Sequence, residues 1–92
     1  MMACEVLRGA AQYLGSYGDR GLDGQYLRRR RMDLFESLSV AGAKQPNAVI
    51  TTFYFLRAAT GQDNLLKWHA SASFEEMRQA LAAATDMAST LQ

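Results

Sequence analysis

The segment 47–60 decides the fold class of this chain, because its composition favours a strand while its spacing also fits a helix. Residues 49–55 are all β-branched or aromatic, and such residues are enriched in β-strands. The apolar residues of the segment also recur at helical spacing, and Pro46 suits a first helical turn. No other segment is a convincing partner strand, and a lone strand leaves its backbone groups unpaired. We therefore predict a helix over 47–60 that stops at Gly61.

The rest of the chain also repeats its apolar residues every three or four positions, which is typical of amphipathic helices. The clearest helix start is Ser73-Phe-Glu-Glu76, a capping box. In this motif the serine side chain accepts from the third amide of the helix, and the glutamate accepts from the amide of the serine. The predicted helices cover residues 3–17, 24–41, 47–60, 63–70 and 73–91.

These segments predict an all-α fold, an irregular bundle of four to five short helices. At 92 residues the chain is long enough for one compact domain, so we expect residues 1–92 to form a single helical domain. The predicted core combines the inward positions of the helices: Val6, Leu7, Leu14, Leu34, Leu38, Val49, Phe53, Leu56, Leu66, Trp68, Phe74, Met77 and Leu81.

Residues suited to catalysis are scarce in this sequence. His69 is the only histidine and Cys4 the only cysteine, so they form the only conceivable Cys–His dyad. We expect Cys4 near a fraying N-terminus, where nothing resembles the sharp turn that exposes a nucleophile. Histidines, cysteines and carboxylates do not recur at metal-ligand spacing. The sequence therefore predicts a protein that is not an enzyme and has no cofactor or metal.

The run Arg28–Arg31 is the most unusual feature of the chain. Ten basic and nine acidic residues leave a net charge of +1, so no global field draws the chain to nucleic acid or to a membrane. On a helix, four consecutive residues spread over roughly 300° and do not form one basic face. Arg31 falls inside the apolar stripe of 24–41. Its stem extends out of the core, or its charge meets an acid of its own chain or an anion supplied by a partner.

The predicted helix 47–60 carries aromatic side chains on more than one side. Phe53 and Phe55 project in nearly opposite directions, with Tyr54 between them. A helix that is apolar all round must be covered on all sides, and a small domain buries only about 60% of its unfolded surface. We therefore expect part of this aromatic surface to meet another chain.

Two functions fit these observations. We favour a non-catalytic protein–protein interaction module, self-associating or acting as a small helical subunit or regulator of a larger assembly. The alternative is an RNA- or DNA-binding protein that sets arginines against phosphates. The lone cysteine and the lack of an apolar run of roughly 20 residues favour a cytoplasmic protein without membrane contact. The predicted partner-binding residues are Arg28, Arg30, Arg31, Tyr54 and Phe55. The nucleic-acid alternative uses Arg28, Arg30, Arg31, Arg57, Lys67 and Arg78.

Overall fold

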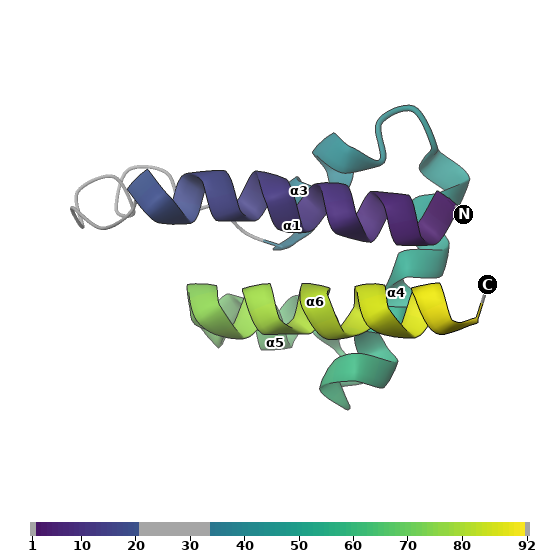
Figure 1. Ribbon diagram of the computed structural model, residues 1–92. Coiled ribbons are helices and arrows are strands. Elements are labelled where there is room, and N and C mark those ends of the chain that lie inside the picture. Colours follow the sequence, from purple (N-terminus) through teal and green to yellow (C-terminus); the bar gives the residue numbers. More distant parts are fainter. Residues whose placement is uncertain (1, 21–33, 92) are drawn as a thin grey trace.

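The computed structural model describes residues 2–20 and 34–91, and helices joined by turns account for these residues. None of the described residues lies in a strand, so the predicted all-α fold is confirmed. The helical interpretation of 47–60 is confirmed with it. Residues 24–33 of the predicted helix 24–41 fall outside the described ranges. The helices are α1 (Met2–Arg20), α3 (Leu34–Ala41), α4 (Pro46–Thr60), α5 (Leu65–Ser71) and α6 (Phe74–Thr90) (Figure 1).

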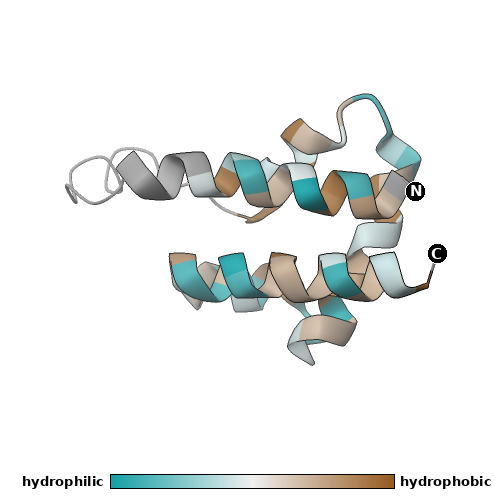
Figure 2. Ribbon diagram, viewed as in Figure 1, coloured by the Kyte–Doolittle hydropathy of each residue, from teal (hydrophilic) through white to brown (hydrophobic). Residues whose placement is uncertain are grey.

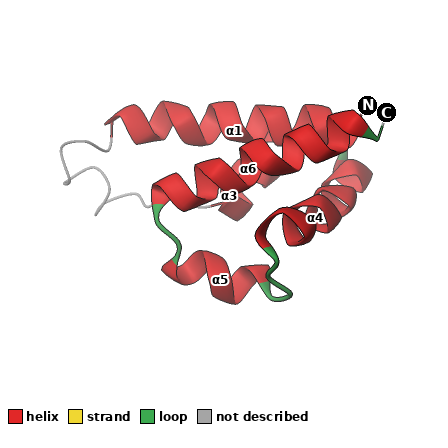
Figure 3. Cartoon of the chain, turned by 60° about the horizontal axis from the view of Figure 1, so that its bottom comes forward, coloured by secondary structure: helices red, strands yellow, loops and turns green. Residues whose placement is uncertain are grey.

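The helices α1 and α6 lie side by side and run in opposite directions, which brings the start of α1 beside the end of α6 (Figures 1 and 3). Helix α3 packs on α1, and α4 contacts both α1 and α6. Helix α5 follows α4 along the chain and leads into α6 (Figure 3). Hydrophobic and hydrophilic stretches alternate along α1 and α6 (Figure 2), as expected for helices that bury one side. The core therefore lies where α1, α3, α4 and α6 meet.

Local sequence signals set the ends of α4. Pro46 occupies the first turn, where its missing amide costs nothing. Gly61 ends the helix with a φ of 71°, a left-handed conformation that glycine adopts without a side-chain penalty, and its amide donates to the carbonyl of Arg57 at 2.8 Å. Both ends agree with the prediction from the sequence.

The predicted capping box of α6 is present. The amide of Ser73 donates to Oε1 of Glu76 at 2.8 Å, and the amide of Glu76 donates to Oγ of Ser73 at 3.0 Å. Each bond satisfies a backbone donor that the helix itself leaves without a partner.

Replacing Ser73 by alanine removes one of these two bonds. We expect the variant to lose about 1 kcal/mol of unfolding free energy, measured by urea denaturation followed by circular dichroism. Ser71→Ala is the matched control, because the exposed Ser71 hydroxyl makes only a long bond of 3.3 Å to the carbonyl of Trp68. A loss for Ser73→Ala no larger than that of the control would show that the capping box contributes nothing.

Most of the predicted core is buried. Four other predicted members are half-buried and pack against the core: Val49, Phe53, Trp68 and Phe74. The buried members are Val6, Leu7, Leu14, Leu34, Leu38, Leu56, Met77 and Leu81.

The prediction that Leu66 belongs to the core is wrong. Leu66 is 67% exposed, and its neighbour Leu65 is 5% exposed. Adjacent residues on a helix point about 100° apart, so the short helix α5 can turn only one of its two leucines inward. Packing against the rest of the chain selects Leu65.

The rotation of α4 also differs from the prediction. Its buried side consists of Ala48, Thr52, Phe55 and Leu56. The sequence pattern placed Phe55 on the opposite side from the core, and this was wrong. Packing turns Thr52 into the core, and its hydroxyl donates to the carbonyl of Val49, so the buried oxygen keeps a hydrogen-bond partner within the helix.

Candidate interaction surface

Large apolar side chains lie exposed on neighbouring parts of α4 and α6. Tyr54 on α4 is 64% exposed and Leu91, directly after α6, is 72% exposed. The remaining members are Ile50 and Ala58 on α4 and Met87 on α6. We call Ile50, Tyr54, Ala58, Met87 and Leu91 the α4/α6 face. Its members include no charged residue.

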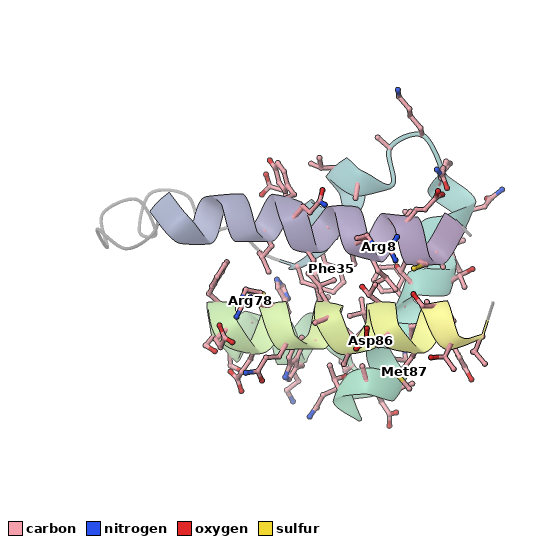
Figure 4. All side chains as sticks on the ribbon, in the orientation of Figure 1. Arg8, Phe35, Arg78, Asp86 and Met87 are labelled. Atoms are coloured by element: carbon pink, nitrogen blue, oxygen red, sulfur yellow. The ribbon has the colours of Figure 1, made fainter. Side chains whose placement is uncertain are left out.

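A hollow of about 300 Å³ opens within this face, in the angle between the two helices. Figure 4 shows Met87 on the side of α6 that lies next to α4. The ring of Tyr54 stands edge-on to the ring of Phe55, with centroids 5.4 Å apart and planes at 82°. The hollow is lined by Tyr54, Phe55, Ala58, Met87, Thr90 and Leu91.

The two aromatic residues predicted to bind a partner therefore have different positions. Tyr54 projects from the surface, whereas Phe55 is buried and closes the bottom of the hollow from the core side. The structure places both beside one hollow, but only Tyr54 offers a partner most of its ring. The predicted partner-binding residues Arg28, Arg30 and Arg31 lie outside the described residues.

Sequence reasoning missed the contribution of α6 to this surface. Met87 and Leu91 are 39% and 72% exposed, and neither is among the residues predicted to bind a partner. The sequence does indicate the α4 part of the surface. Ile50 and Tyr54 are four residues apart and therefore lie on one line of the helix surface. Nothing in the sequence shows that the end of α6 lies beside that line.

The basic residues of the nucleic-acid alternative lie on three different helices. Arg57 is on α4, Lys67 on α5 and Arg78 on α6, and all three are exposed. Arg78 forms two hydrogen bonds to the carboxylate of Glu75, at 3.1 and 3.0 Å. The hydrogen bonds from Arg78 hold the pKa of Glu75 below its ordinary value, and a hydrogen bond from the side-chain amide of Gln79 lowers this pKa to a smaller extent. Arg78 lies near the start of α6, away from Met87 (Figure 4).

Arg57 borders a second hollow, of about 400 Å³, on another side of α4. The half-buried rings of Phe35 and Phe53 line it, with centroids 5.8 Å apart. His69 stands edge-on to Phe35 at 4.6 Å, and its Nδ1 lies 2.9 Å from the carbonyl oxygen of Leu66. His69 therefore belongs to an aromatic cluster whose members come from α3, α4 and α5.

Cys4 occupies a different cluster from His69. The thiol shares a hydrogen bond of 3.0 Å with the hydroxyl of Ser89, and the Arg8 guanidinium donates to the sulfur at 3.2 Å. The exposed side chain of Arg8 extends from α1 toward α6 (Figure 4). Cys4 is only 4% exposed, so the expected position near a fraying terminus was wrong. The reason is that α1 begins against the last turn of α6, which covers the thiol.

Comparison of the chain with protein-family models, with curated proteins and with solved structures finds no match. Over residues 2–20 and 34–91, no three His, Cys, Asp or Glu side chains form a group that could hold a metal ion. No helix in this part of the chain combines the length and apolar character that crossing a bilayer requires.

Proposed function

We propose that this chain is a non-catalytic protein–protein interaction module that contacts another protein chain through the α4/α6 face. The observation that carries the proposal is the exposure of Ile50, Tyr54 and Leu91, each about two thirds open to solvent or more. Fully burying one such side chain contributes about 1.5–3 kcal/mol. Exposed apolar residues that gather in one patch, in contrast to scattered ones, are typical of interaction sites.

The charge distribution favours this function over nucleic-acid binding. Residues 2–20 and 34–91 contain seven acidic and six basic side chains, so this part of the chain has no excess of positive charge. Arg78 is engaged with Glu75. Nucleic-acid binding draws its affinity from several cations that follow a phosphate backbone, and Arg57, Lys67 and Arg78 come from three separate helices. The rival function thus rests on Arg28, Arg30 and Arg31.

Photo-cross-linking tests the proposal even though the partner is unidentified. A benzophenone amino acid replaces Tyr54 in the full chain within the natural host, and mass spectrometry identifies the covalent adducts. We expect adducts to one reproducible segment of a protein chain. The same probe at Leu66, an equally exposed residue of α5 outside the α4/α6 face, is expected to yield none. Absence of protein adducts from position 54 would contradict the proposal.

The rival function makes a different prediction about salt. If Arg28, Arg30 and Arg31 bind phosphates, the logarithm of affinity for a short RNA or DNA duplex falls with the logarithm of salt concentration, with a slope of about −0.7 to −0.9 per phosphate neutralised. We expect no such binding in fluorescence anisotropy. Salt-sensitive binding that disappears when these three arginines become alanine would establish the rival function.

A further inference from the structure

The exposed side chains along one line of α4 run from a large residue at one end to a small one at the other, an order that fits a second copy of the same line running in the opposite direction. Ile50, Tyr54 and Ala58 follow one another at intervals of four residues, so a large aliphatic, an aromatic and a small side chain share one line along the helix. All three are exposed. The hollow of about 300 Å³ lies beside Tyr54 and Ala58. The large residue therefore stands at one end of the line and the available space at the other.

From this order we propose that the α4/α6 face binds the same face of a second copy, with the two α4 helices antiparallel about a two-fold axis at Tyr54. The inference rests on the proposed function and names its partner. The two-fold operation sets Tyr54 beside its own equivalent and Ile50 opposite Ala58 of the second copy. Each Ile50 then fills the hollow of the other copy. A parallel pairing would set Ile50 against Ile50 and leave both hollows empty, which sacrifices packing contacts.

The charges along α4 permit this arrangement. Residues 47–56 contain no charged side chain, and the charge nearest to Tyr54 on α4 is Arg57. The axis sets Arg57 opposite the uncharged Thr51 of the second copy. The two Arg57 residues are separated by about 9 Å along the helix direction, which is close to the screening distance of physiological salt. No like-charge pair therefore opposes the dimer within the described part of α4.

The apolar area limits the strength of the dimer. The exposed parts of Ile50, Tyr54, Met87 and Leu91 amount to roughly 500 Å² per copy, which is comparable with the largest patch on a typical monomer. With a polar rim, two copies bury on the order of 1,200 Å², at the lower limit of specific interfaces. We therefore expect a reversible dimer with a dissociation constant on the order of micromolar.

Disulfide trapping in the purified full chain tests the position of the axis. A residue on the axis approaches its own equivalent, so Tyr54→Cys is expected to form a covalent dimer quickly under mild oxidation. The two copies of position 50 are separated by about 12 Å along the helix direction, beyond the reach of a disulfide. Ile50→Cys, which is equally exposed, is therefore the matched control and is expected to remain reduced. The inference is overturned if position 50 forms the covalent dimer as readily as position 54.

A charge swap tests the pairing of Ile50 with Ala58. Ile50→Lys and Ala58→Glu each place a charge in an apolar contact, so each is expected to raise the dissociation constant at least about tenfold in sedimentation equilibrium. The double variant is expected to recover association, because the introduced lysine meets the introduced glutamate of the second copy. Within one chain these positions lie about 12 Å apart, so an internal ion pair cannot explain a recovery. Both sites are exposed, and melting curves confirm that the variants fold.

The outcomes separate this inference from the proposed function. Failure of the double variant to recover association, after both single variants have lost it, overturns the antiparallel arrangement. A natural protein that remains monomeric up to millimolar concentration overturns self-association. If cross-links from position 54 then reach a different protein, the proposed function stands while the second copy is excluded as the partner.

Discussion

Replacing Leu81 by alanine is expected to lower the free energy of unfolding by about 3 kcal/mol. Leu81 lies in α6 and is fully buried among the residues of the core cluster. The substitution removes burial of apolar surface and leaves a cavity that surrounding helices fill only in part. Urea denaturation monitored by circular dichroism measures the change.

Leu66→Ala is the control for this prediction. Leu66 is 67% exposed, so the same chemical change is expected to alter the unfolding free energy by less than about 0.5 kcal/mol. Equal losses for the two variants would contradict the position of the core. The control also tests whether Leu66 lies at the surface of α5, since the sequence pattern alone placed Leu66 in the core.

Replacing Gly42 by alanine is expected to cost about 2 kcal/mol of unfolding free energy. Gly42 is buried in the turn between α3 and α4, where its amide donates to the carbonyl of Leu38 at 2.8 Å. An added Cβ would overlap Cγ2 of Val49 and stand 3.0 Å from the carbonyl oxygen of Leu38. The backbone oxygen cannot yield as a flexible side chain can, so the turn must shift.

Two further variants test whether the loss expected for Gly42→Ala comes from steric overlap in the turn. Gly15→Ala in α1 meets no atom within 4 Å, and it is expected to stabilise the chain by about 0.5–1 kcal/mol through higher helix propensity. Adding Val49→Ala to Gly42→Ala removes the overlapping methyl groups and is expected to recover part of the loss. A stabilising effect of Gly42→Ala in thermal denaturation would contradict the described turn.

The positions of helix ends were predictable because short-range hydrogen bonds set them. Pro46, Gly61 and Ser73 act on amides and carbonyls within a few residues of themselves, and each has the predicted role. The candidate site was predictable only in part. Tyr54 is exposed beside an apolar hollow as expected of a partner-binding residue, whereas Phe55 is buried. The predicted contribution of Arg28, Arg30 and Arg31 lies outside the described residues.

The sequence by itself determined that residues 2–20 and 34–91 are largely helical and where most of the helices among them begin and end. The tertiary structure decided which side of each helix is covered. It selected Leu65 over Leu66, rotated α4 so that Phe55 faces inward, and set Leu91 beside Tyr54. It also buried Cys4 against Ser89, a residue 85 positions away in the chain. Local hydrogen bonds fix the length of a helix, but they are indifferent to its rotation about its own axis. That rotation follows from packing against distant segments, which local spacing does not encode.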